Sequence, residues 1–73
     1  MPSRQYPVQI AFGQRVRGLR EAKGWTQEEL AEKADIHRTY LGGIERGLRN
    51  VALRNIAKIA QAFDLSLSEF FQY

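Results

Sequence analysis

The chain alternates segments of helical period with short polar or glycine-containing breaks. In residues 10–23 the apolar positions stand three or four residues apart, with arginines on the other faces; they are Phe12, Val16 and Leu19. This spacing predicts an amphipathic helix, and Gly24 directly after it is typical of a helix end. Residues 1–9 contain two prolines and show no period, so we expect an extended N-terminal arm there.

A second helix is predicted to begin at Thr26. Thr26 and Glu29 have the spacing of a capping box, in which each side chain binds the backbone N–H of the other residue. The expected inward stripe of this helix consists of Leu30, Ala31 and Ala34. Asp35 follows at the turn, where a left-handed backbone suits glycine best but is tolerated by aspartate.

The third predicted helix runs from residue 37 or 38 to about residue 46, and Gly47 ends it. Its inner face is expected to hold Leu41 and Ile44. On a helical wheel the opposite stripe holds Thr39, Gly42, Gly43 and Arg46. Two glycines inside an exposed helix cost about 2 kcal/mol relative to alanine. We therefore interpret the two glycines as a bare helix surface that can approach a sugar-phosphate backbone or a base edge. The alternative interpretation is a close helix–helix contact.

Two further helices complete an all-α pattern of five. Asn50 is expected to cap the fourth helix, in which apolar residues again recur at helical spacing: Leu53, Ile56, Ala60 and Phe63. Ser66 and Glu69 form a second capping-box pattern that opens a short fifth helix through Phe71. We expect one compact domain over residues 10–73, preceded by the arm.

The second and third predicted helices are joined by a tight turn, and a basic residue opens the later one. This is the helix-turn-helix arrangement, which presents one helix end to the major groove of DNA. The charge agrees with a polyanionic partner: the net charge is +3, and residues 37–50 carry three arginines against one acidic residue. Residues 26–36, by contrast, carry four acidic residues against one lysine.

The composition excludes several other classes of protein. A chain of 73 residues has room for a single core and no deep catalytic cleft, and no set of residues suits an enzyme. There is no cysteine, and the lone His37 cannot build a metal site, so we expect no metal, no cofactor and no small-molecule ligand. No apolar run approaches the roughly 20 residues of a membrane span, and no signal peptide is visible, so we expect a cytoplasmic protein.

The amino end of the third helix holds the candidate base-reading residues. Arg38 can donate two hydrogen bonds to guanine O6 and N7, although an isolated arginine is usually a solvated one. Thr39 can donate to a phosphate or contact a thymine methyl group. Tyr40 fits equally well as a stacking residue near the DNA backbone and as a half-buried support. His37 is expected to cap the helix, with a phosphate as a second partner.

Polar residues flank this helix on both sides in the sequence. Gln27 lies in the first turn of the second helix, where backbone N–H groups point outward and bind phosphates. Three residues at and after the end of the third helix can clamp the flanking phosphates: Arg46, Arg49 and Asn50. Arg20 and Glu45 each adjoin an apolar position, and we expect them to form a structural ion pair rather than to contact a ligand.

The run WTQEELAEKADIHRTYLGGIERG, followed by NIAKIAQAFDLSLSEFF, resembles the phage repressor/Cro-like helix-turn-helix family, often called XRE-like. The resemblance covers about residues 10–71, and HRTYLGGIERGLRN is most similar to small controller proteins of restriction–modification systems. It implies a five-helix domain that binds a palindromic operator as a homodimer, with Gln27 on the DNA backbone, Arg38 and Thr39 in the groove, and Arg20 paired with Glu45. The residues that it places close by are Tyr40, Arg46, Arg49 and Asn50.

The resemblance also implies dimerisation through the C-terminal helices, where the chain has a large apolar end: Leu67, Phe70, Phe71 and Tyr73. Two positions depart from the family pattern. Asp35 stands where many members have glycine, which implies some strain in the turn. Gly42 replaces a common polar residue, so specificity would depend more on Arg38 and on DNA shape.

The function expected from these features is that of a sequence-specific, homodimeric transcriptional regulator that binds double-stranded DNA. Two alternatives stay open at this point. One is a protein-interaction module, such as an antitoxin or an adaptor, which the C-terminal aromatic residues would also suit. The other is the DNA-binding half of a longer repressor.

Overall fold

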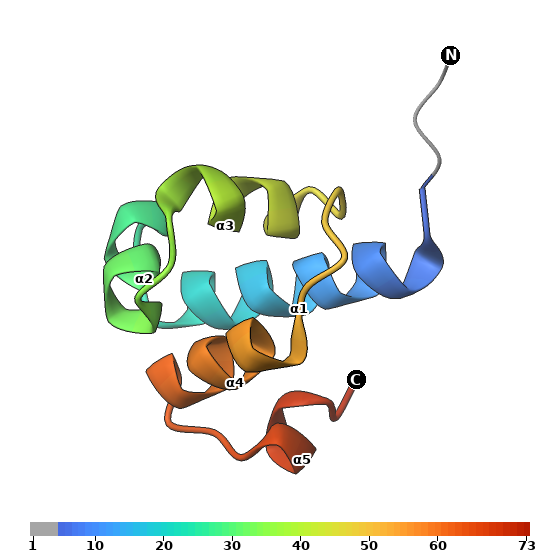
Figure 1. Cartoon of the computed structure of the whole chain (residues 1–73). Helices are drawn as coiled ribbons and strands as arrows, with labels where there is room; N and C mark the ends of the chain where they lie inside the picture. The colour runs from blue at the N-terminus through green and yellow to red at the C-terminus, as the bar shows by residue number, and fades with distance from the viewer. Residues whose placement is uncertain (1–4) are drawn as a thin grey trace.

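The computed structural model describes residues 5–73, which form five α-helices and no strand (Figure 1). The helices are α1 (Pro7–Ala22), α2 (Gln27–Ala34), α3 (Arg38–Glu45), α4 (Leu53–Ala62) and α5 (Leu67–Phe70). In Figure 1, α1 lies between α3 on one side and the α4–α5 pair on the other, and α2 closes one end. This arrangement confirms the all-α, five-helix prediction.

The first helix begins earlier than its apolar period indicates. Pro7 occupies the first turn of α1, where a fixed φ and a missing N–H cost nothing. The expected boundary between an arm at 1–9 and a domain at 10–73 is therefore wrong for residues 7–9, which are helical. Residues 1–4 of the expected arm lie outside the described part of the chain.

Local side-chain chemistry fixes the start of α2 and the turn after it. The Thr26 hydroxyl accepts from the Glu29 backbone N–H at 3.1 Å, and the Glu29 carboxylate accepts from the Thr26 N–H at 2.9 Å, so the capping box is present. Asp35 ends α2 in the left-handed conformation, with φ 55° and ψ 50°. The turn therefore has the backbone geometry expected for it, without the glycine that suits that geometry best.

The start of α4 differs from the prediction. Asn50 does not cap this helix: Ala52 stands at the N-cap position and makes no side-chain bond. Because the helix begins at Leu53, that residue lies in its first turn at the margin of the core and is 70% exposed. Ile59 is fully buried instead. The other predicted members of the inner face are confirmed, because Ala60 and Phe63 are buried and Ile56 is half-buried.

A single apolar core joins all five helices. Its buried members are Phe12, Val16, Leu30, Ala31, Ala34, Leu41, Ile44, Ile59, Ala60, Phe63 and Phe70. The inward stripes predicted for α2 and α3 are confirmed by this set. Phe70 was expected at a dimer interface, but its side chain is fully buried, with its ring 5.3 Å from that of Phe12. A fully buried ring cannot contact a partner, so Phe70 is a core residue.

Gly13 allows α1 and α3 to approach closely. A Cβ at this position would collide with the backbone oxygen of Ile44 and would lie 2.9 Å from that of Glu45. Inside a helix, glycine is less favourable than alanine by up to about 1 kcal/mol. The position of Gly13 shows a packing role, because α3 crosses α1 where no side chain fits.

Candidate nucleic-acid interface

The amino end of α3 projects from the molecule as the helix-turn-helix pattern predicts. His37, Arg38 and Thr39 are all exposed. The Thr39 backbone N–H donates to Nδ1 of His37 at 3.2 Å, which confirms that His37 caps the helix. Since Nδ1 accepts this bond, a neutral His37 ring carries its proton on Nε2 and keeps a donor for an outside acceptor.

Arg38 lies beside an acidic residue of the neighbouring helix. Its Nη1 is 3.4 Å from Oε1 of Glu28, in the first turn of α2. The side chains of Arg38 and Glu28 are 63% and 74% exposed, so solvent weakens the pair. Nothing in the local sequence indicates that Glu28 lies beside Arg38. The helix-turn-helix geometry, which brings the amino ends of α2 and α3 together, was the signal that could have identified it.

The paired glycines do not form a bare surface. Gly42 and Gly43 are both buried, in contrast to the prediction of an outward-facing pair. A Cβ on Gly43 would lie 3.1 Å from Nε and 3.2 Å from Cγ of Arg49, so the arginine stem covers this glycine. A Cβ on Gly42 would lie 3.8 Å from Gln27 Oε1 and 3.9 Å from Arg46 Nη1. A helical wheel misses this cover because the covering side chains come largely from outside α3.

Tyr40 also contacts Arg49. The Arg49 guanidinium carbon lies 5.6 Å from the centre of the Tyr40 ring, a cation–π contact. The Tyr40 hydroxyl accepts a hydrogen bond from Nδ2 of Asn55, on α4, at 3.3 Å. Tyr40 is therefore a half-buried support, one of the two roles left open for it. No local sequence signal identified Asn55, because its contact depends on how α4 packs.

Gln27 is connected to the buried ion pair. Its Nε2 donates to Oε1 of Glu45 at 3.0 Å. Arg20 binds the same carboxylate through Nε at 2.8 Å and Nη2 at 3.0 Å, so the predicted ion pair of Arg20 and Glu45 is present. The hydrogen bond to Glu45 raises the pKa of Arg20 above its ordinary value, and burial opposes this shift. The network fixes the Gln27 side chain at the amino end of α2.

The residues predicted to contact DNA thus fall into three groups. The exposed ones are His37, Arg38, Thr39, Arg46, Arg49 and Asn50. Gln27 and Tyr40 are half-buried and bound to neighbouring side chains. Gly42 and Gly43 are covered, so they cannot contact a base or a phosphate as the side chains now lie.

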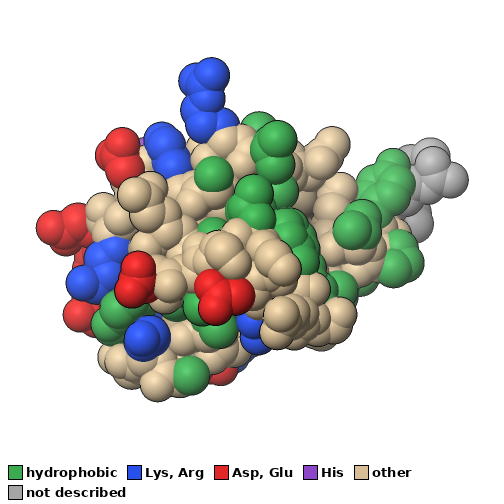
Figure 2. All heavy atoms as spheres, turned by 90° about the horizontal axis from the view of Figure 1, so that it is seen from below, with side chains coloured by type: hydrophobic (Ala, Val, Ile, Leu, Met, Phe, Trp, Pro, Cys, Tyr) green, Lys and Arg blue, Asp and Glu red, His purple; other side chains and the backbone are tan. Residues whose placement is uncertain are grey.

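Apolar side chains gather on a different face of the molecule. Figure 2 views the chain from below Figure 1 and shows hydrophobic side chains across the centre and right, with charges mainly at the left. Three of the four apolar residues predicted to form a dimer interface are exposed at the C-terminal end. The exposed fractions are 39% for Leu67, 45% for Phe71 and 57% for Tyr73. Arg15 fixes this end by donating to the backbone oxygens of Phe70 and Glu69 at 2.9 and 3.1 Å. Burial raises the pKa of Tyr73.

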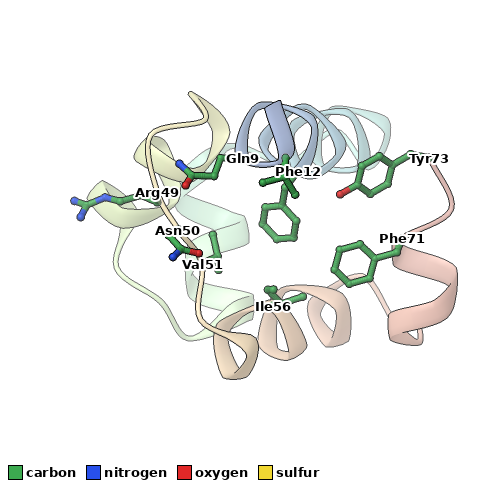
Figure 3. Close-up of a pocket in the computed structure, with 9 residues that line it drawn as sticks. Gln9, Phe12, Arg49, Asn50, Val51, Ile56, Phe71 and Tyr73 are labelled. Carbon is green, nitrogen blue, oxygen red and sulfur yellow. The ribbon is translucent and has the colours of Figure 1, made fainter. Parts of the chain in front are cut away.

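A shallow groove of about 250 Å³ adjoins the C-terminal aromatic residues. In Figure 3 the rings of Phe12, Phe71 and Tyr73 line the space between α1, α4 and α5, with Ile56 at its floor. Apolar side chains make up most of the lining, and Gln9, Arg49 and Asn50 stand at its other end. The groove is thus continuous with the exposed apolar surface at the C-terminal end.

Two other kinds of feature are absent from residues 5–73. No group of three His, Cys, Asp or Glu residues in this part of the chain could hold a metal ion. None of the helices there is long and apolar enough to cross a membrane.

A capped helix pair, a left-handed turn and an exposed amino end of the later helix define a helix-turn-helix domain. Residues 16–70 match the helix-turn-helix family, and the chain belongs to it, in the phage repressor/Cro-like branch. The control protein C.BamHI of Bacillus amyloliquefaciens is 43% identical over 67 residues, which cover 90% of this chain and 83% of that protein.

Two solved structures resemble the chain along most of its length. The restriction-modification controller protein C.AhdI from Aeromonas hydrophila is 52% identical, with a TM-score of 0.86, and the match covers 90% of this chain and all of that one. The controller protein C.Esp1396I, solved as a tetramer with its natural 35 base-pair operator, is 32% identical, with a TM-score of 0.87. That match covers 93% of this chain and 90% of the other. The resemblance to controller proteins is therefore confirmed.

Proposed function

We propose that this protein is a sequence-specific regulator of transcription that binds double-stranded DNA as a homodimer on a palindromic operator, in the manner of a controller protein. One observation carries the proposal: the exposed amino end of α3 bears Arg38 and Thr39. Helix-turn-helix domains place this helix end in the major groove, where side chains reach base edges. The proposed role is one of binding rather than catalysis, and we assign it to the cytoplasm.

In the proposed complex Arg38 reads a guanine and Thr39 contacts a neighbouring base or phosphate. Arg49 supports the flank of α3, because Gly43 and Tyr40 hold its stem and its guanidinium in place. A cation fixed in this way binds a phosphate with less loss of side-chain freedom than a free one. Gln27, Arg46 and Asn50 complete the proposed set of backbone contacts.

The proposed dimer forms through the exposed apolar residues of the C-terminal end, Leu67, Phe71 and Tyr73, without Phe70. A two-fold axis through this end pairs the same patch of both copies. The two α3 helices then enter major grooves whose centres are one helical turn apart, about 34–36 Å. The operator is expected to be palindromic for the same reason.

Selection of DNA fragments from a random pool, followed by gel-shift titration, tests the function. The expected result is one enriched palindromic motif that the protein prefers over competitor DNA. In the enriched duplex, Arg38→Ala costs about 1–3 kcal/mol of binding free energy and relaxes selectivity at one base position of each half-site. Unchanged affinity and selectivity in this variant would show that Arg38 does not read the groove.

The alternatives predict other results. A protein-interaction module shows no fragment preference over competitor DNA. The DNA-binding half of a longer repressor prefers a fragment but stays monomeric at micromolar concentration in sedimentation. The two measurements together therefore separate the three functions.

A further inference from the structure

The pairing of Arg38 with Glu28 is unexplained by the proposed function. Glu28 Oε1 lies 3.4 Å from Arg38 Nη1, on the surface proposed to face DNA. Both side chains are more than half exposed, so the pair contributes little to the stability of the fold. A carboxylate at this place also repels the phosphates of an approaching duplex. Neither the stability of the fold nor the overall affinity for DNA therefore explains the pair. A contribution to sequence recognition would explain it.

The geometry of the guanidinium indicates what that contribution is. Arginine has five N–H donors in a rigid plane, and in Arg38 the one directed at Glu28 belongs to Nη1. The edge formed by Nε and Nη2 stays free, and two parallel donors are what guanine O6 and N7 accept. Arg38 can therefore bind a guanine through one edge while it keeps Glu28 at the other.

A contact between Arg38 and a phosphate has a different consequence. If the guanidinium turns away from Glu28 toward the DNA backbone, the carboxylate is left unpaired close to the polyanion. An unpaired charge brought out of water is unfavourable, and here the nearby phosphates add repulsion. Operator DNA that offers a guanine avoids this penalty, whereas other DNA incurs it.

We propose that Glu28 is a positioning residue that raises discrimination: it holds Arg38 in the orientation that reads a guanine and penalises contacts of Arg38 with phosphates. The inference rests on the proposed DNA-binding function, and on Arg38 as a groove contact within it. It adds to that function a specificity role for an acidic residue on α2.

The variant Glu28→Gln tests the inference, with Glu32→Gln as its matched control. Both substitutions remove one negative charge from an exposed position of α2, and Glu32 forms no ion pair within residues 5–73. Each protein is titrated with the duplex that wild type selects from a random pool and with a scrambled duplex of the same composition. Thermal melting checks that both variants are folded.

Glu28→Gln is expected to bind the scrambled duplex about three- to tenfold more tightly than wild type, because a close carboxylate–phosphate repulsion is lost. Its affinity for the selected duplex stays within about twofold, so the ratio of the two affinities falls. Glu32→Gln is expected to change both affinities by the same factor and to leave their ratio unchanged. In an Arg38→Gln background, Glu28→Gln should leave the ratio unchanged as well.

Equal effects of the two glutamine variants would overturn the inference, because Glu28 would then act only through net charge. A fall in the ratio that persists in the Arg38→Gln background would also overturn it, because Glu28 would then act without Arg38. A wild-type protein that shows no preference for any duplex contradicts the proposed function itself, and the inference with it. The wild-type titration therefore distinguishes the two failures.

Discussion

Arg20 and Glu45 join the C-terminal part of α1 to the last residue of α3 through two hydrogen bonds, of 2.8 and 3.0 Å. Arg20 also donates to the backbone oxygen of Trp25 at 2.8 Å, just before α2 begins. The Glu45 carboxylate accepts a third bond, from Gln27 at the start of α2. One buried carboxylate thus fixes the relative positions of three helices and of one proposed phosphate contact.

Removal of Glu45 is expected to destabilise the fold strongly. Glu45→Ala leaves the Arg20 charge, whose side chain is only 12% exposed, without its partner, which costs about 3–5 kcal/mol of unfolding free energy. Urea denaturation followed by circular dichroism measures the loss. Glu21→Ala is the control: it breaks the exposed pair with Arg17 and should cost at most about 1 kcal/mol. Similar losses for the two variants would contradict the structural role of the buried pair.

Two glycines of the same helix should respond in opposite directions to alanine. Gly13→Ala places a methyl group against backbone oxygens of α3 and is expected to cost about 1–3 kcal/mol, because backbone cannot move aside easily. Gly18→Ala enters open space on α1 and is expected to stabilise the protein by about 0.5–1 kcal/mol, since alanine favours helix. Thermal or urea denaturation of both variants measures the two changes in unfolding free energy. A neutral Gly13→Ala would show that α1 and α3 do not cross closely there.

Arg49→Ala should weaken the binding of every DNA sequence by a similar factor. Its guanidinium lies over Tyr40 at the flank of α3, where we place a phosphate contact, and a phosphate contact carries no base information. The slope of log affinity against log salt concentration is expected to fall in magnitude by about one. Arg17→Ala, which removes an exposed charge from α1, is the matched control and should leave the slope unchanged. A change in sequence preference in Arg49→Ala would contradict a purely electrostatic role.

Leu67→Glu should weaken self-association without unfolding the monomer. Leu67 is 39% exposed at the first position of α5, where an acidic residue suits the helix dipole. In a symmetric dimer the substitution brings two negative charges together in an apolar contact. Sedimentation equilibrium is expected to show a shift toward monomer, whereas Ala22→Glu, which adds the same charge at the end of α1, should leave the equilibrium unchanged. A dimer that withstands Leu67→Glu would place the interface elsewhere.

Acid should destabilise the fold in part through the two capping boxes. Hydrogen bonds from the backbone and side chains of Thr26 and Ser66 lower the pKa of Glu29 and of Glu69 from the ordinary value of 4.5. A carboxyl whose folded-state pKa is lowered contributes stability above its unfolded-state pKa, and this stability is lost as the pH falls through the lowered value. The unfolding free energy should therefore fall below about pH 5, and less steeply in a Glu29→Gln, Glu69→Gln double variant. Glu32, whose carboxylate makes no capping bond, provides the control substitution.

Features that depend on residues close in sequence were predictable. Both capping boxes, the His37 cap and the left-handed Asp35 require only a few neighbouring residues, and all are present. The inner faces of α2 and α3 follow from helical period in the same way. The ion pair of Arg20 and Glu45 was also anticipated, because both residues adjoin apolar positions and the family resemblance implies the same pair.

Two of the predictions that failed depend on residues distant in sequence. Arg49 covers Gly43, which a wheel of α3 alone shows as exposed. Phe70 is buried because it packs against Phe12, more than fifty residues earlier. The Asn50 cap failed for a local reason, because α4 begins three residues later, at Leu53.

By itself the sequence determined the five helices, the caps of α2, α3 and α5, the turn at Asp35, and the helix end that carries Arg38. Hydrogen bonding within a few residues and the 3.6-residue period are local properties. The tertiary structure alone decided which side chains close over that helix and which stay free. It placed Gln27 on Glu45, Arg49 on Gly43, and Glu28 beside Arg38. These contacts join different segments of the chain, so they arise from the packing of α1 to α4 around one core and are not encoded in any single segment.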